Sequence, residues 1–147
     1  MNKLEQIRKW LKGYPGTLPV QSLKVDYYST QPDNGSIDPS GLIEVTRETD
    51  IMGNITVENQ LNFALYFVLL KSPGDDEGAT ENADLLMDLQ QWIQEQSICG
   101  LAPIFGDDPD AETIKAQNGA VYAADEEGTA IYMVQLSINY IKYYEVN

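Results

Sequence analysis

The chain has 147 residues, of which 43% are hydrophobic and 22% charged, the composition of one folded domain rather than of a disordered segment. Nine basic against twenty-three acidic residues give a net charge of −14, which opposes sequence-specific binding to nucleic acid, because such binding relies on neutralising phosphates. With no histidine and one cysteine, the chain lacks the commonest general base and cannot form an internal disulfide or a multi-thiolate metal site. We expect a single domain over residues 1–147.

A short helix is predicted at the N-terminus. Asn2 is suited to cap it, with Glu5 three residues later completing the capping pattern, and Gly13 is suited to end it. The N-terminus has no apolar signal core, and no stretch is long and apolar enough to cross a bilayer, so no contact with a membrane is expected. The apolar face of the helix consists of Leu4, Ile7 and Leu11.

The next segment predicts strands joined by turns. Apolar and polar residues alternate from Leu23 to Tyr27, which is typical of a half-buried strand. Residues 29–41 are rich in Gly, Pro, Asn, Asp and Ser and predict a long surface loop. A second strand is expected over residues 42–50, followed by a hairpin turn at residues 52–54.

A long third strand is predicted over residues 55–71, which contain neither glycine nor proline. Its later half is apolar on both faces, so we expect it to be a central strand or to be covered by a partner. One face consists of Leu61, Phe63, Leu65, Phe67 and Leu69.

The clearest helix is predicted over residues 80–97, with Thr80 as its cap and Gly100 as its end. Acidic and amide side chains occupy the side opposite the apolar stripe, as in a helix that packs on a core. The stripe consists of Leu85, Leu86, Leu89, Trp92 and Ile93.

A final hairpin is predicted from a strand over residues 114–124, a turn at 125–128 and a strand over 129–146. The last strand has one apolar face and one mixed face, and the mixed face is free to meet a neighbouring chain. The candidate subunit-interface residues are Met133, Gln135, Tyr143 and Tyr144.

The sequence carries no catalytic motif: no nucleophile elbow, no phosphate-binding glycine loop and no histidine to pair with serine or cysteine. Asp108, Asp110 and Glu112 have the odd spacing of a calcium loop, but Thr113 stands where such a loop needs glycine and Gly119 where it needs glutamate. We therefore expect no enzyme activity, no metal site and no cofactor.

The order of elements predicts an α+β fold, with a mainly antiparallel sheet built from two long hairpins and two helices packed on one face. The helix IRKWL, the strand LKVDYY, the hairpin strand NFALYFVLL, the helix LLMDLQQWIQEQ and the terminal strand YMVQLSINYIKYY together resemble the bacteriophage minor capsid or tail terminator proteins. The resemblance covers most of the chain and rests on element order and pattern, with no diagnostic motif.

This resemblance implies a structural protein of a phage or prophage virion, found in the virion and in the cytoplasm of the bacterial host. Proteins of that family form a homo-oligomeric ring, usually a hexamer, at the head-proximal end of a long tail. The implied partners are the tail tube protein and the head connector, joined through strands and loops. An acidic lumen in such a ring would let DNA pass without adhering.

Three other functions agree with the same sequence. The chain also fits another head-tail connector or neck subunit, a monomeric acidic adaptor that binds proteins, or an inhibitor that mimics DNA. A DNA mimic needs rows of carboxylates on one face, whereas the acidic residues here are scattered between loops and a helix.

Overall fold

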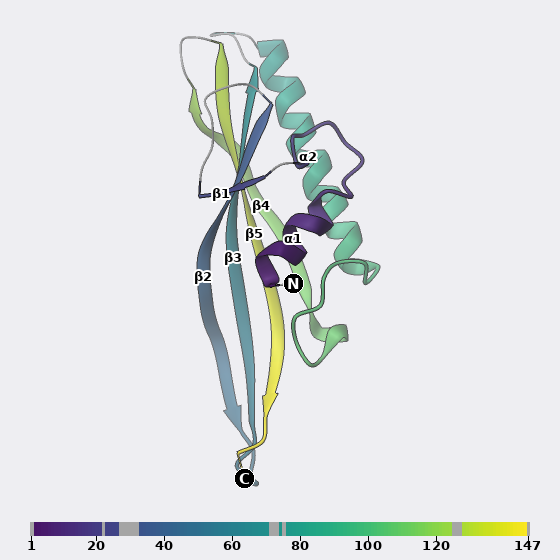
Figure 1. Cartoon of the computed structure of the whole chain (residues 1–147), viewed down its shortest axis with the longest axis vertical. Coiled ribbons are helices and arrows are strands. Elements are labelled where there is room, and N and C mark those ends of the chain that lie inside the picture. Colours follow the sequence, from purple (N-terminus) through teal and green to yellow (C-terminus); the bar gives the residue numbers. More distant parts are fainter. Residues whose placement is uncertain are drawn as a thin grey trace.

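The computed structural model describes residues 2–21, 23–26, 33–70, 74, 76–124 and 128–146. Over these residues the chain forms a five-stranded sheet and two α-helices, an α+β fold as the sequence predicts (Figure 1). In chain order the elements are α1 (Lys3–Leu11), β1 (Lys24–Val25), β2 (Asn34–Thr49), β3 (Ile55–Leu70), α2 (Asp76–Ile98), the 3-10 helix η1 (Pro109–Ala111), β4 (Thr113–Ala124) and β5 (Thr129–Tyr144).

The strands lie in the order β1-β2-β3-β5-β4, and the sheet is mixed. β2 with β3, β3 with β5 and β4 with β5 are antiparallel, whereas β1 runs parallel to β2 and pairs with it only at Ser36 and Ile37. One parallel pair thus stands beside the antiparallel pairs that the sequence predicts, and the prediction of two long hairpins is not confirmed. Asp26 and Asp33, on either side of the β1–β2 connection, have positive φ angles of 55° and 63°. Such residues turn the backbone sharply, so β1 ends after two residues.

The core lies on one face of the sheet. Odd-numbered residues of β3 pair with even-numbered residues of β5, and the pair Leu65 and Val134 is fully buried beneath the helices. The alternation predicted for β3 is confirmed, since side chains of successive residues point to opposite faces. The core residues of the sheet include Ile37, Phe63, Leu65, Phe67, Tyr132, Val134, Leu136 and Ile138.

The N-terminal helix forms as predicted. The Asn2 side chain accepts a hydrogen bond from the Glu5 backbone N–H at 2.8 Å, which satisfies one of the unpaired donors at the start of α1. Ile7 and Leu11 are buried on its inner face. This cap is a local feature, so the sequence alone was sufficient to find it.

Helix α2 begins at Asp76, earlier than the predicted start at Thr80. The Thr80 hydroxyl donates to the Asp76 carbonyl at 2.9 Å, so Thr80 lies inside the helix and does not cap it. Leu86, Leu89 and Ile93 of the predicted stripe are buried.

Aromatic side chains join the N-terminal segment to α2. The rings of Trp10 and Trp92 are stacked with centroids 5.2 Å apart, and the Trp10 indole N–H donates to Gln96 at 3.1 Å. The Tyr14 ring lies 5.4 Å from Trp92, and its hydroxyl donates to the Asp88 carboxylate at 2.5 Å. These contacts hold α1 and the following residues against α2.

The predicted loop over residues 29–41 is wrong from residue 34 onward, because those residues belong to β2. They pair with β3 in register, with Ile37 opposite Leu65. A bulge follows Pro39, which lacks the N–H that regular pairing needs. Residues 29–32 of that prediction and most of the predicted turn at 125–128 lie outside the described residues.

Neither helix in the described part of the chain is long and apolar enough to cross a membrane.

Candidate interaction surface

The sheet is much longer than the helices that cover it. Below the end of α2, three strands continue side by side to the far end of the molecule, where the chain's C-terminus also lies (Figure 1). We call this part the blade and define it as residues 41–49 of β2, 55–61 of β3 and 138–144 of β5. Every residue of β2 from Pro39 to Thr49 is exposed.

The outer edge of β2 is open along the blade. Among the described residues, β1 pairs with β2 only as far as Ile37, and no strand pairs with the outer edge beyond that point. Two bulges interrupt β2, between Pro39 and Gly41 and between Glu44 and Thr46. Bulges and charged side chains discourage indiscriminate pairing at an edge, so they restrict which strand can dock here.

Three exposed side chains of this edge are nevertheless large and aliphatic. Leu42, Ile43 and Val45 have 57%, 53% and 44% of their surfaces accessible. The Arg47 guanidinium binds the Glu44 carboxylate at 2.7 Å on the same strand. The edge of β2 therefore combines unpaired backbone, exposed aliphatic side chains and one local ion pair.

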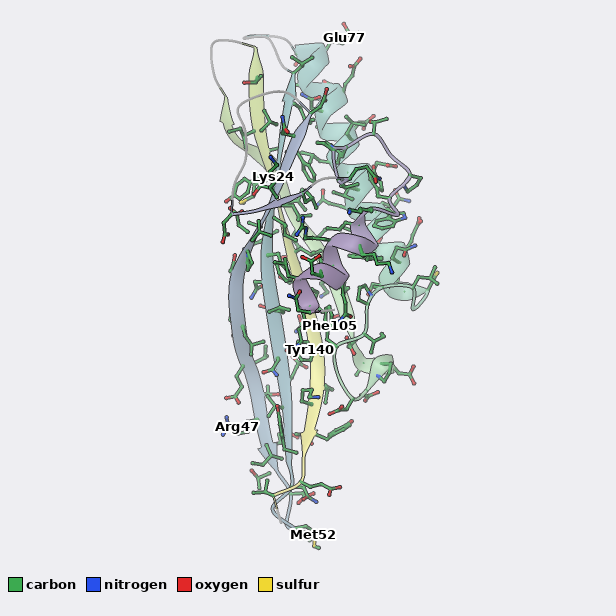
Figure 2. The ribbon with its side chains drawn as sticks, viewed as in Figure 1. Lys24, Arg47, Met52, Glu77, Phe105 and Tyr140 are labelled. Carbon is green, nitrogen blue, oxygen red and sulfur yellow. The ribbon has the colours of Figure 1, made fainter. Side chains whose placement is uncertain are left out.

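The tip of the blade is an ordered turn that presents two large apolar side chains. The Asp50 carboxylate accepts hydrogen bonds from the backbone N–H groups of Met52 at 2.9 Å and Asn54 at 3.0 Å, and Gly53 has a φ of 87°. Ile51 is 103% exposed and Met52 is 67% exposed, and Figure 2 shows Met52 at the extreme end of the molecule. Turn tips are usually polar, so two exposed large apolar side chains are unusual at this position.

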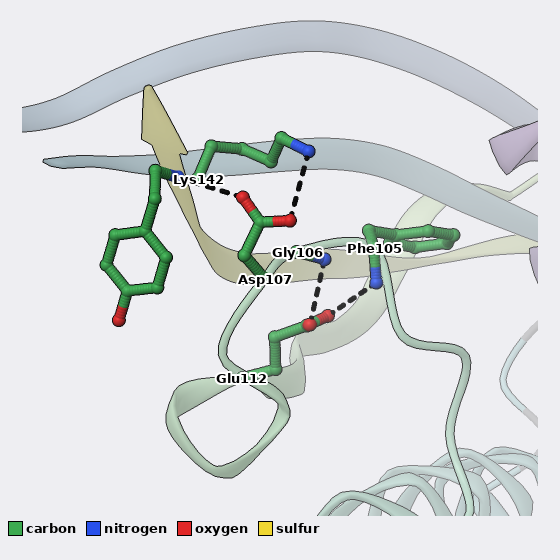
Figure 3. A network of polar contacts seen from close by, with 6 residues as sticks. Phe105, Gly106, Asp107, Glu112 and Lys142 are labelled. Carbon is green, nitrogen blue, oxygen red and sulfur yellow. Dashed lines mark hydrogen bonds and ion pairs between the residues drawn. The ribbon is translucent and has the colours of Figure 1, made fainter. Parts of the chain in front are cut away.

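The opposite edge of the blade is covered by residues 105–108, which we call the clamp. The backbone N–H of Asp107 donates to the Ile141 carbonyl at 2.7 Å, and the Asp107 carboxylate accepts from the Tyr143 N–H at 2.9 Å. Glu112 holds the clamp from behind, accepting from the N–H groups of Phe105 and Gly106 at 2.8 and 2.9 Å (Figure 3). The β5 edge is thus satisfied within the chain, in contrast to the β2 edge.

The groups around Asp107 favour the observed position of the clamp. The Tyr143 N–H, and then the Lys142 ammonium 3.4 Å away, hold the pKa of the Asp107 carboxyl below its ordinary value. Phe105 packs edge-on against Tyr140, with ring centroids 6.2 Å apart. The clamp is thus fixed by both polar and aromatic contacts.

On the sheet face opposite the helices, β3 and β5 contact each other through polar side chains. Asn139 donates to Glu58 at 3.3 Å and accepts from Gln60 at 3.2 Å, and Ser137 donates to Asn62 at 2.8 Å. These cross-strand bonds fix the register of β3 and β5 without an apolar layer. The apolar surface of the blade is therefore concentrated at the β2 edge and the tip.

The four predicted interface residues do not form one patch. Met133 is half-buried and Gln135 is exposed on the sheet face away from the helices. They lie about eight to eleven residues, or roughly 30 Å, along β5 from the two tyrosines. Tyr143 and Tyr144 are 51% and 48% exposed near the tip, and they point to opposite faces of the sheet.

The sequence-based prediction missed Ile51 and Met52 as surface candidates, although it located the turn beside them. The signal was present, since two large apolar residues directly precede Gly53 in a predicted hairpin turn. The β2 edge residues were missed for a different reason. A run such as residues 42–45 looks like an ordinary strand, and only the sheet order reveals that its outer side has no partner.

Acidic side chains of the loop after α2 form hydrogen bonds that hold the clamp in place. Both Glu112 oxygens are engaged by backbone N–H groups, and the Asp108 carboxylate accepts from the Tyr143 hydroxyl at 3.3 Å. Within the described ranges, no group of three histidine, cysteine, aspartate or glutamate side chains is placed to hold a metal ion. Asp107, Asp108 and Glu112 are thus engaged in hydrogen bonds within the chain.

A comparison with models of known protein families finds no match, and neither does a comparison with curated proteins.

Proposed function

We propose that this protein is a structural subunit of a phage or prophage virion that assembles with copies of itself into a ring of the tail terminator type. The ring would lie at the head-proximal end of a long tail, between the tail tube protein and the head connector. The single observation that carries the proposal is the blade, whose tip exposes Ile51 and Met52 and whose β2 edge has no strand partner among the described residues.

The blade supports assembly because a single chain gains no stability from leaving its large apolar side chains exposed. Burying a large aliphatic side chain contributes about 1.5–3 kcal/mol, so the tip pair alone offers a substantial driving force for contact. The tip is held in one conformation by the Asp50 side chain, so little conformational entropy is lost when it docks. Ordered apolar residues of this kind are typical of subunit interfaces.

The arrangement of the elements supports the more specific family assignment. Two long antiparallel strand pairs, β2 with β3 and β4 with β5, together with two helices on the core face, follow the order on which the resemblance to tail terminators rests. The net charge of −14 supports a passage for DNA, because an acidic lumen repels phosphates and limits adhesion.

Electron microscopy of the purified protein at high concentration tests this proposal. The proposal predicts rings with a central opening, most often of six subunits. Gene position provides a second test, since the gene should lie between head-completion genes and the gene for the major tail protein. Particles without an opening, together with a gene in a metabolic operon, would contradict the proposal and favour the adaptor function.

A further inference from the structure

A groove of about 610 Å³ runs between α2 and the free edge of β4, on the side of the sheet opposite β2. One wall is a stripe of α2 that recurs at helical spacing, from Met87 through Gln90, Gln91 and Gln94 to Ile98. The other wall is residues 113–117 of β4. Met87 and Ile98, at the two ends of the stripe, are 57% and 77% exposed.

Backbone groups of β4 point into this groove. Alternate residues of an antiparallel edge strand direct their N–H and C=O groups away from the sheet. Here the Ile114 N–H donates to the Ser97 hydroxyl at 3.0 Å, and the Ala116 carbonyl accepts from the Gln90 side chain at 3.1 Å. Two flexible side chains of α2 thus occupy the positions that a further strand would take, and they can exchange those bonds for backbone ones.

The groove also differs in charge from the rest of the chain. Its described lining includes five glutamine or serine side chains and no carboxylate, and Lys115 is its one charged residue. Copies of a chain with a net charge of −14 repel one another over most of their surfaces. The groove is therefore a place where a second acidic copy can approach with little repulsion.

We propose that the outer edge of β2 from a second copy of this chain docks in the groove beside β4, so that the sheet continues from one subunit to the next. This inference rests on the proposed self-assembly and identifies the two surfaces that meet. The two edges can complete each other's backbone hydrogen bonding. No strand of the described residues pairs with the outer edge of β2 along the blade, and the Ile114 and Ala116 backbone groups of β4 bond side chains of α2 instead of another strand.

The side chains of the two edges are complementary if the helices stay on one side of the continuous sheet. Leu42 of β2 then lies on the α2 side, where Met87 and Ile98 are exposed. Ile43 and Glu48 lie on the opposite side, the same side as Lys115 of β4. Glu48 thus lies on the same side as Lys115, the single lysine of the groove. Leu42 lies on the same side as the apolar ends of the groove.

The bulges of β2 divide this pairing into two short regular stretches. These are residues 41–44 and 46–49, each comparable in length with the groove wall at residues 113–117. The β2 and β4 edges are different surfaces at opposite sides of one sheet, so their contact is head-to-tail. Such a contact closes into a ring when the rotation between subunits permits it, and it gives an open filament when it does not.

Cross-linking in the assembled protein tests the inference. A photo-reactive residue replaces Gln117, and isotope-labelled and unlabelled copies are mixed so that links between chains are distinguished from links within one chain. The expected result is a link from position 117 of one copy to residues 42–49 of another. The same photo-reactive residue at Glu81, on α2 but outside the groove, is the control and should give no such link.

A charge reversal gives an independent readout. Lys115→Glu should weaken self-association about 10-fold or more, whereas Lys12→Glu, an exposed lysine outside the groove, should leave it within about 2-fold of the wild type. Oligomers that form normally in Lys115→Glu, or whose links from position 117 reach other segments, overturn this inference and leave the proposed assembly intact. If no oligomer forms under any condition, the proposed function fails, and this inference fails with it.

Discussion

Replacing Gly106 by alanine should detach the clamp from β5. A Cβ at this position would lie 2.4 Å from the Ile141 carbonyl oxygen and 2.9 Å from the Ile141 nitrogen. Both atoms belong to the backbone of β5 where it is paired with Glu58 of β3, so they cannot move aside cheaply. The clamp has to move instead, and the hydrogen bond from the residue 107 N–H to Ile141, now 2.7 Å, is lengthened or lost.

The size of the effect follows from these contacts. Overpacking of this kind costs about 1–3 kcal/mol. A lost backbone hydrogen bond adds about 1 kcal/mol. We expect the free energy of unfolding to fall by about 2–4 kcal/mol, which for a chain of this size corresponds to a decrease in Tm of about 4–16 °C.

Urea denaturation followed by tryptophan fluorescence is a suitable assay, because Trp10 and Trp92 are stacked between α1 and α2 and report global unfolding. Glu112→Gln is the matched partner variant, since a glutamine amide offers one acceptor where the carboxylate serves two N–H groups. Both changes loosen the same clamp, so the double variant should lose less stability than the sum of the single ones. A loss below about 0.5 kcal/mol for Gly106→Ala would refute the close contact with Ile141.

Three further predictions follow from buried or charged contacts. Asn82→Ala removes the side-chain donor to the Leu70 carbonyl and the Tyr132 hydroxyl at the end of the core. Urea denaturation should show that the free energy of unfolding falls by about 1–3 kcal/mol. An unchanged midpoint would contradict those two hydrogen bonds. Burial, and then the hydrogen bond to Asp88, raise the pKa of Tyr14 well above its ordinary 10.0, so the stability that this group contributes is present below pH 10 and is lost as the pH rises from there. The free energy of unfolding, measured from pH 8 to 11, should therefore fall more steeply for the wild type than for Tyr14→Phe. Parallel curves would count against the prediction. The lowered pKa of the Asp107 carboxyl gives stability that is present above its ordinary pKa of 3.8 and is lost as the pH falls through the folded-state pKa. The free energies of unfolding of the wild type and of Asp107→Asn should therefore converge on acidification. A constant difference down to pH 2 would disprove the role of the ionised carboxylate.

The features that the sequence predicted best are those that depend on residues close together in the chain. The cap of α1 was found because Asn2 and Glu5 stand at a fixed local spacing. β3 was found because alternation over a long run without glycine or proline has few alternatives. The apolar stripe of α2 was found for the same kind of reason, and three of its residues, Leu86, Leu89 and Ile93, are buried.

Tertiary contacts decided what the sequence did not predict. The residues from Asn34 to Gly41 have the composition of a loop, yet pairing with β3 holds them in a strand, and a bulge accommodates Pro39. The clamp depends on bonds between Asp107 and Tyr143, residues that no local pattern connects. The open edge of β2 is a property of strand order, which the local pattern around Leu42 does not contain.

The molar mass of the purified protein, measured by light scattering over a range of concentrations, tests self-assembly through the blade most directly. The wild type should form an oligomer, with a mass near six times 16.4 kDa if the ring is a hexamer. Ile51→Ser combined with Met52→Ser should keep the wild-type stability, because both side chains are exposed, and should weaken assembly by at least about 100-fold. A wild type that stays at 16.4 kDa at every concentration, or a double variant that assembles as well as the wild type, would contradict the account.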